Sequence, residues 1–322
     1  MGKYREYAPA LFAGNKIMPY DIAGMIDLPY VGNIYYVDPT NGSDTANNGS
    51  EQNKALKTVA AAYAKCTAYQ NDVVLIVPTG TTVRTTETAA IVWAKGMTHL
   101  IGNGAPTMFG KRSGMEFSSA VVSPCFTVNA IGCIFKNLYV IVTEDINVLW
   151  KVTANQNYFS NCWFAGAANT TTGNDAAARS VVVSAASENT FDNCVFGTET
   201  ANSSAANGSL EFTGTCRRNV VRHCLFDKYD TAGTSFHVIA DTGNCMEMAL
   251  IFEDCMFINP LLIGSTTIQA ALIRTTLTNA GIIYLNNCTY YGATAIADVL
   301  THVMCFQTTG DTTAQGLFVV AG

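Results

Sequence analysis

The chain has 322 residues, of which 49% are hydrophobic and only 13% charged, and its formal net charge is −6 at pH 7. This length suits one sizeable solenoid or two small globular domains. The acidic balance and the lack of a basic cluster argue against nucleic acid as a partner. No apolar run is long enough to span a bilayer, so we expect no membrane partner either.

Residues 1–33 show no sustained periodicity and are too few for a core of their own. A segment of this kind becomes ordered only when something else holds it, so we predict an anchoring arm that lies on a partner chain. The predicted partner-binding residues are Tyr4, Tyr7, Met18, Tyr20 and Tyr30. The start of the chain lacks the apolar stretch of a secretion signal, which predicts folding in the cytoplasm of the producing cell.

Residues 34–71 predict a strand, an Asx-rich loop and a helix. Leu56, Val59, Ala60 and Tyr63 fall on one face at helical spacing. We expect this helix to cap the open end of a solenoid, where a bare coil would expose apolar core and a strand edge. The loop over residues 38–51 lacks the Asp-x-Asx-x-Asx-Gly pattern of a calcium loop. Plain Asx turns are therefore the preferred interpretation, and we expect no metal and no cofactor.

Residues 72–322 contain a repeated string that reads apolar, variable, Asn-like, Cys, variable, aromatic. Its cysteines lie 32, 30, 31 and 33 residues apart, at Cys162, Cys194, Cys224, Cys255 and Cys288. A fixed period in this range marks a solenoid. The repeats lack helical spacing, and each has a second β-rich segment, such as Val148–Val152 or Phe236–Ala240, and a long polar loop. This plan predicts an all-β fold, a right-handed parallel β-helix.

The Asn-like position predicts a sharp bend between two strands. An asparagine in the left-handed conformation would let the residues on both sides of it point inward, and the candidates are Asn137, Asn161, Asn193 and Asn287. His223 and Asp254 hold this position in two repeats, where we expect the asparagine ladder to be interrupted. Like side chains of successive coils should then stack in interior columns. We predict that the five cysteines form one such column as reduced, buried thiols, because in-register neighbours have poor disulfide geometry.

At these residues the chain resembles the right-handed, pectate-lyase-like β-helix family, over roughly residues 34 to 322. The resemblance implies that the asparagines form a ladder in the bend between two sheets. The opening stretch at residues 34–44, Ile-Tyr-Tyr-Val-Asp-Pro-Thr-Asn-Gly-Ser-Asp, is similar to the start of β-helix proteins common among bacteriophage structural proteins and some secreted bacterial proteins.

Members of this family are often polysaccharide lyases or hydrolases. The long loops hold few carboxylates, so the calcium cluster of a lyase has no positions here. A hydrolase needs two carboxylates about 5–9.5 Å apart. Asp192 and Glu253 would lie two coils apart, roughly 9.6 Å by strand spacing, with Arg222 between them. We prefer an exposed ladder of opposite charges, because Arg222 fills the space that a sugar would enter.

Our main hypothesis is a virion structural protein on the exterior of a bacteriophage, most simply a head decoration or cement protein. We expect a homotrimer, assembled in the host cytoplasm, that contacts other virion proteins through residues 1–33. The alternative is a tailspike-type receptor-binding protein that cleaves a host surface glycan with Asp192 and Glu253. A secreted carbohydrate-binding β-helix is a third possibility.

Overall fold

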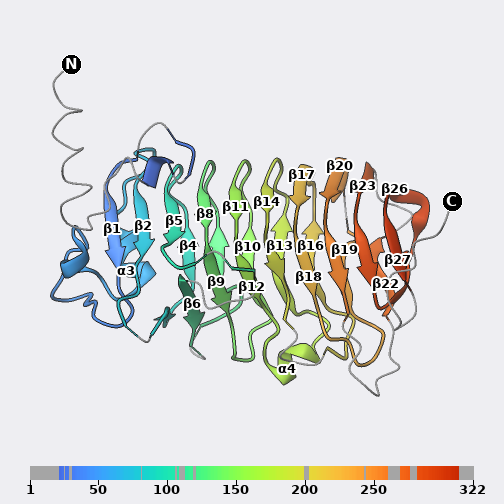
Figure 1. The fold of residues 1–322 in the computed structure, drawn as a ribbon, viewed down its shortest axis with the longest axis horizontal. Coiled ribbons are helices and arrows are strands. Elements are labelled where there is room, and N and C mark those ends of the chain that lie inside the picture. Colours follow the sequence, from blue (N-terminus) through green and yellow to red (C-terminus); the bar gives the residue numbers. More distant parts are fainter. Residues whose placement is uncertain are drawn as a thin grey trace.

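The computed structural model describes residues 22–24, 26–28, 31–80, 82–105, 107–108, 113–118, 121–198, 203–242, 244–259, 269–275 and 281–311. Within these residues the chain winds into a stack of coils along an elongated molecule (Figure 1). Each complete coil gives one strand to each of three sheets, which we name A, B and C in the order in which the chain visits them.

Every pairing between the described strands is parallel, and each strand pairs with its equivalents in the coils before and after. Sheet A contains β1 (Ile34–Val37), β2 (Val73–Ile76), β5 (His99–Gly102), β8 (Ile134–Lys136), β11 (Tyr158–Ser160), β14 (Thr190–Asp192), β17 (Arg217–Arg222), β20 (Met246–Glu253), β23 (Gly281–Asn286) and β26 (Val303–Phe306). Sheet B contains β3 (Arg84–Glu87), β6 (Ser113–Phe117), β9 (Leu138–Ile141), β12 (Trp163–Ala165), β15 (Val195–Phe196), β18 (Leu225–Asp227), β21 (Met256–Ile258), β24 (Thr289–Tyr291) and β27 (Thr309–Asp311). Sheet C contains β4 (Ile91–Trp93), β7 (Phe126–Val128), β10 (Val148–Val152), β13 (Arg179–Ser184), β16 (Gly208–Thr213), β19 (Phe236–Ala240), β22 (Gln269–Thr275) and β25 (Ala293–Ala297). The predicted right-handed parallel β-helix is confirmed.

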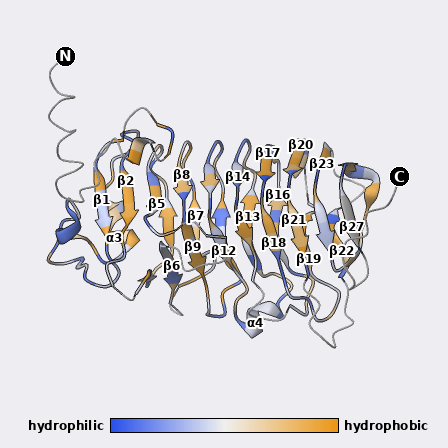
Figure 2. Ribbon diagram, viewed as in Figure 1, coloured by the Kyte–Doolittle hydropathy of each residue, from blue (hydrophilic) through white to orange (hydrophobic). Residues whose placement is uncertain are grey.

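The core lies inside the coils, where like residues stack in columns. Phe135, Phe159 and Phe191 are fully buried, and their ring centroids are 5.0 and 4.5 Å apart in successive coils. Parallel strands covered on their inner face read as apolar runs, and Figure 2 shows hydrophobic residues along the strands throughout the stack. Burying one such aromatic side chain contributes on the order of 2–3 kcal/mol, so the repeated aromatic positions hold the coils in register.

A short helix, α3 (Val59–Lys65), covers the first coils, as the sequence predicted. Thr58 caps it by accepting a hydrogen bond from the backbone N–H of Ala61. Its buried face is Val59, Ala62 and Tyr63, whereas Ala60 is exposed. The prediction for Ala60 was wrong because the helix begins at Val59, after Leu56, so the inward positions follow a spacing of three and four from Val59.

The solenoid begins earlier than the predicted boundary at residue 72, because β1 already pairs in register with β2. Between them, the loop over residues 38–51 forms Asx turns. The Asp38 carboxylate accepts hydrogen bonds from the backbone N–H groups of Thr40 and Asn41, at 2.9 and 3.1 Å. A 3₁₀ turn, η1 (Gln52–Lys54), leads to the helix.

Two further short helical elements lie in the loops between strands. The helix α4 (Thr170–Gly173) lies in the long loop between sheets B and C, and the 3₁₀ turn η2 (Leu300–His302) precedes β26. In the last described coil the side chains of Met304 and Phe306 are 41% and 47% exposed.

Candidate functional site

The charged column predicted on sheet A sits on the outer face of the strands. Strand register places six residues in successive coils, in the order Lys136, Ser160, Asp192, Arg222, Glu253, Asn286. Each of them directly follows a buried residue of the column that contains Phe135, Phe159 and Phe191. Because side chains alternate along a strand, these six residues point outward. The structure thus brings both predicted candidate carboxylates and the intervening arginine onto one surface.

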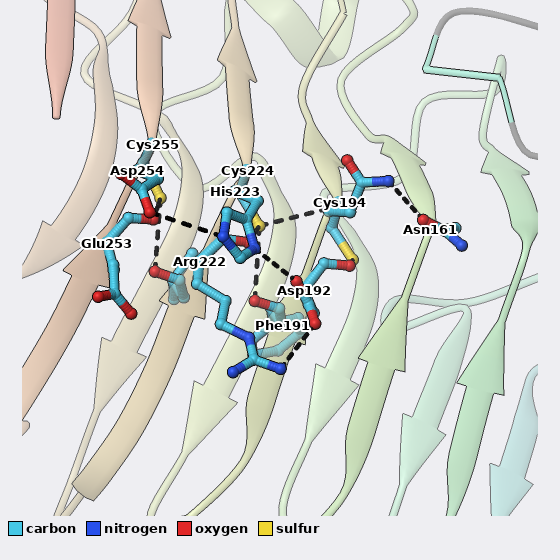
Figure 3. A network of polar contacts seen from close by, with 12 residues as sticks. Asn161, Phe191, Asp192, Cys194, Arg222, His223, Cys224, Glu253, Asp254 and Cys255 are labelled. Carbon is cyan, nitrogen blue, oxygen red and sulfur yellow. Dashed lines mark hydrogen bonds and ion pairs between the residues drawn. The ribbon is translucent and has the colours of Figure 1, made fainter. Parts of the chain in front are cut away.

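Asp192 is the centre of the network in Figure 3. Its Oδ2 accepts hydrogen bonds from Arg222 Nη2 at 2.8 Å and from Tyr158 Oη at 2.9 Å, and its Oδ1 lies 2.9 Å from Nδ1 of His223. Burial would raise the pKa of Asp192, but the bonds from His223, Arg222 and Tyr158 outweigh it and lower that pKa. The carboxylate is therefore held in its ionised form.

Glu253 lies two coils from Asp192, a distance of about 9.6 Å by strand spacing. Its Oε1 accepts a long hydrogen bond from Asn286 Nδ2 at 3.5 Å. Arg222 lies between the two carboxylates and donates to Asp192 (Figure 3). A glycosidase needs one carboxylic acid with a raised pKa to protonate the leaving group. Asp192 has the opposite perturbation, and it forms an ion pair with Arg222.

The bend between sheets A and B has a left-handed backbone in seven successive coils. The φ angles lie between 48° and 60° at Asn137, Asn161, Asn193, His223, Asp254, Asn287 and Gln307. Asn193 Nδ2 donates to Asn161 Oδ1, and Asn137 Nδ2 donates to the carbonyl of Gly102 at 2.8 Å. These contacts satisfy amide groups that the sharp turn would otherwise leave unpaired.

His223 and Asp254 change the chemistry of this ladder without altering its backbone. His223 turns to Asp192, and its Nε2 lies 3.6 Å from Oδ2 of Asp254. Asp254 in turn accepts a hydrogen bond from Asn287 Nδ2. The polar column therefore continues through Asp254, because a carboxylate accepts the amide hydrogen as well as an amide oxygen does.

The five repeat cysteines form an inward column, and each is at most 2% exposed. Cys162 Sγ donates to the carbonyls of Phe135 and Ser160, both at 3.4 Å, and Cys194 and Cys224 make the equivalent bonds in the next coils. All eleven cysteines are free thiols. Burial raises the pKa of the Cys224 thiol. A small apolar side chain that can also donate to a carbonyl explains the residue type at this position.

A second asparagine ladder, which the sequence analysis missed, runs through the bend before sheet A. Oδ1 of Asn157, Asn189 and Asn219 accepts a backbone N–H from the preceding coil, at 2.9, 3.0 and 2.9 Å. All three are at most 2% exposed. The signal was present, because each asparagine stands five residues before a repeat cysteine.

The structure also buries two basic residues. Lys228 is 6% exposed and His237 is fully buried, and both ring nitrogens of His237 lack a hydrogen-bond partner among the described residues. Burial lowers the pKa of Lys228 to about 7 and that of His237 to about 3. Neither residue belongs to the repeated string, so periodicity gave no sign of them.

The predicted arm is described only in part. Its proposed contact residues Tyr4, Tyr7, Met18, Tyr20 and Tyr30 lie outside the described residues. Ile22, Ala23 and Ile26 are buried against apolar side chains of β1, β2 and β5, on the outer face of sheet A. This part of the segment packs on its own chain, because the first three coils carry apolar residues outward there.

Within the described ranges, no group of three His, Cys, Asp or Glu side chains is placed to hold a metal ion. None of the helices described there is long and apolar enough to cross a membrane.

Comparison with known proteins gives structural matches only. No family model matches the chain, and no curated protein matches it in sequence. A pectin methylesterase solved with a hexasaccharide matches with a TM-score of 0.59 and 12% identity, over 88% of this chain and 90% of that one. A rhamnogalacturonan lyase matches with a TM-score of 0.55 and 16% identity, over 88% and 75% of the two chains.

A third match is the ORF18 protein of Geobacillus virus E2, with a TM-score of 0.54 and 12% identity, over 92% of this chain and 60% of that one. The chain has the pectate-lyase-like β-helix fold. The resemblance seen in the repeated string is thereby confirmed, and at these identities the likeness extends to the fold alone.

Proposed function

We propose that the protein is a structural component on the exterior of a bacteriophage particle, most simply a head decoration or cement protein. The observation that carries this proposal is that the Asp192 carboxylate is already hydrogen-bonded to neighbouring side chains. Its carboxylate is bound by Arg222, His223 and Tyr158, so the best candidate for catalysis on the surface serves the scaffold. The fold shared with the Geobacillus virus E2 protein supports the same assignment.

The attachment to the particle is proposed to run through residues 1–33, and the protein is proposed to act as a homotrimer with other virion proteins as partners. Ile22, Ala23 and Ile26 fix the end of this segment to sheet A. The residues before Ile22 include Tyr4, Tyr7, Met18 and Tyr20, which supply aromatic and flexible apolar side chains of the kind enriched in interfaces.

Replacement of Tyr4, Tyr7, Met18 and Tyr20 by serine in the full chain tests the anchor. Purified particles should lose the protein while its melting temperature in solution is unchanged. Tyr69→Ser is the matched control, because Tyr69 is 63% exposed and lies outside the proposed anchor. Equal occupancy of the particle by both variants would contradict the anchor, and absence of the wild-type protein from particles would contradict the whole proposal.

A second candidate is a tailspike-type receptor-binding protein with polysaccharide depolymerase activity. The fold shared with a pectin methylesterase and a rhamnogalacturonan lyase favours it. Asp192 and Glu253 would then be the catalytic pair. Wild-type protein and the double variant Asp192→Ala, Glu253→Ala are incubated with capsule or lipopolysaccharide. Cleavage by the wild type that the double variant lacks would establish this second function in place of a purely structural role.

A further inference from the structure

The outer face of sheet A carries two rows of side chains in register from β11 to β26. One row is the charged column described above, which continues to Phe306 on β26. The row beside it is mostly apolar and contains Tyr158, Thr190, Val220, Ile251, Tyr284 and Met304. We name these two rows the sheet A strip. It is about 24 Å long, because its six strands follow one another at about 4.8 Å.

The strip ends in exposed apolar side chains on β26. Met304 and Phe306 are 41% and 47% exposed, and the ring of Tyr284 stacks beside that of Phe306 with 6.3 Å between the centroids. Among the residues that the structure describes, nothing covers these two side chains as Ile22 and Ile26 cover apolar side chains at the other end of sheet A. Association that buries the apolar end of the strip would therefore be favourable.

We propose that the sheet A strip binds the same strip of a second copy, face to face, with the two solenoids antiparallel. The two-fold axis runs along the strands, midway between β17 and β20. Strand β17 then faces β20 of the second copy, β14 faces β23, and β11 faces β26. An axis in this direction preserves position along each strand, so the charged column faces the charged column and the apolar row faces the apolar row.

Opposite charges meet in this arrangement. Arg222 lies opposite Glu253 of the second copy, and by symmetry Glu253 lies opposite the Arg222 of that copy. Asp192 lies opposite Asn286, whose amide can donate to a carboxylate. Within one chain Arg222 already donates to Asp192, whereas Glu253 accepts only a long hydrogen bond from Asn286 among the described residues. The contact therefore supplies a cation to the less engaged of the two carboxylates.

Neighbouring registers are less favourable. An axis on β17 would place Arg222 opposite its own equivalent, and an axis on β20 would do the same for Glu253. An axis between β20 and β23 would place Arg222 opposite Phe306. An axis between β14 and β17 would bring β26 against β5, where Ile101 is already buried in a cluster with Ile26. Wrong registers are thus opposed by like charges or blocked, which favours a single alignment.

The apolar row fits the same alignment. Met304 lies opposite Tyr158 of the second copy, and Ile251 lies opposite Val220. Stable dimers bury roughly 1,200–2,000 Å² in total, which is more than two narrow rows supply, so we expect weak association that salt weakens further. This two-fold contact is distinct from the proposed trimer contact. On a particle it would join copies of neighbouring trimers, a role that rests on the proposed virion function, whereas the contact itself is measured on the isolated protein.

The test is chemical crosslinking of the isolated full chain in a Cys305→Ser background, which lacks the exposed thiol. Thr190→Cys and Tyr284→Cys add thiols on β14 and β23. These positions face each other across the proposed contact, but within one chain they lie three coils apart, about 14 Å. A bismaleimide too short to span three coils should give a covalent dimer from the double variant and none from either single variant.

Charge variants test the register. Glu253→Arg, added to the double variant, should lower the dimer yield about tenfold at low salt, because two arginines then face each other. Further addition of Arg222→Glu should restore the yield, because the charges are opposite again. Lys151→Glu, on the half-exposed face of β10 in sheet C, is the matched control and should leave the yield unchanged. Melting temperatures recorded alongside show that each variant is folded.

Two results on the isolated protein would overturn the proposal: no covalent dimer from the double variant at high protein concentration, or a dimer yield that Glu253→Arg leaves unchanged. The same thiols are then probed on purified particles. A crosslink to a different virion protein in place of a second copy would also overturn it. Particle occupancy of the anchor variants is a separate readout, so failure here leaves the proposed virion function untouched.

Discussion

Lys228 should lower the stability of the native protein at neutral pH. It follows β18 at the corner where the chain leaves sheet B, and its Nζ donates to the carbonyl of Phe236 at 3.2 Å. The nearby carboxylate of Asp230 is used by the loop itself, since it accepts the N–H groups of Ala232, Gly233 and Ser235 at 2.8–2.9 Å. Among the residues that the structure describes, the ammonium is therefore buried without a close ion pair. Burial lowers its pKa to about 7, Asp230 acts against this, and Arg179 adds to it.

The magnitude follows from the difference in pKa between the two states. An unfolded lysine has a pKa of 10.5 and the folded one about 7, which corresponds to about 5 kcal/mol once the pH is below both values. Removing the hydrogen bond to Phe236 costs about 1 kcal/mol. We expect Lys228→Met to raise the free energy of unfolding by about 4 kcal/mol at pH 6.

The direction of the Lys228 pKa shift determines how the free energy of unfolding depends on pH. A lowered lysine pKa means that the unfolded state binds the proton more tightly, so the penalty is absent above about pH 10.5, grows as the pH falls to about 7 and stays constant below that. Guanidinium unfolding of both proteins from pH 6 to 10.5 measures the gap, with Lys151→Met, on the half-exposed face of β10, as control. A gap that is zero or negative at pH 6, or that does not narrow with rising pH, would refute the reasoning.

The remaining predictions concern the ladders, the cap and the thiols. Asn219→Ala removes a fully buried amide whose Oδ1 accepts from Asn189 and whose Nδ2 donates to Ala186, and it should cost about 2–4 kcal/mol in chemical denaturation. The exposed Asn155→Ala should cost less than about 1 kcal/mol, and equal losses would contradict a structural second ladder. Glu87, which accepts from the N–H groups of Val59 and Ala60 at the start of α3, has a pKa raised chiefly by burial. The cost of burying the ionised Glu87 carboxylate is present above its raised pKa and is relieved as the pH falls toward 4.5. Glu87→Gln should therefore make the free energy of unfolding less dependent on pH in that window. An unchanged slope would contradict this. Of the eleven thiols, only the exposed Cys305 should react rapidly with a thiol reagent before denaturation, and several fast thiols would mean that the cysteine column is open to solvent.

Much of the fold follows from the sequence because the repeat sets the register. Once Cys162 and its equivalents are assigned to one column, the flanking aromatics must also stack, and the predicted strands at Val148–Val152 and Phe236–Ala240 have those bounds in the structure. The same register places Asp192, Arg222 and Glu253 on one face. Periodicity works here because each coil repeats the environment of its neighbour.

Features that depend on contacts between unlike segments did not follow from the sequence. The assignment of Ala60 to the buried face failed because the start of the helix is set by the cap at Thr58. A spacing pattern does not show where a helix starts. Asp192 forms hydrogen bonds with Tyr158 and His223, and the three residues belong to three different coils. Lys228 and His237 occur in one coil alone. Lys228 lies in the loop between sheets B and C, whereas His237 lies on β19 with its ring against Phe226 and Phe257.

The most direct measurement is surface labelling of purified virus particles with a membrane-impermeant amine reagent, followed by mass spectrometry of this chain. An exterior protein anchored through its N-terminal segment predicts that the chain is present and that the exposed Lys54 and Lys65 are modified on intact particles. Absence of the chain from particles, or labelling of these lysines only after the particles are disrupted, would contradict the assignment.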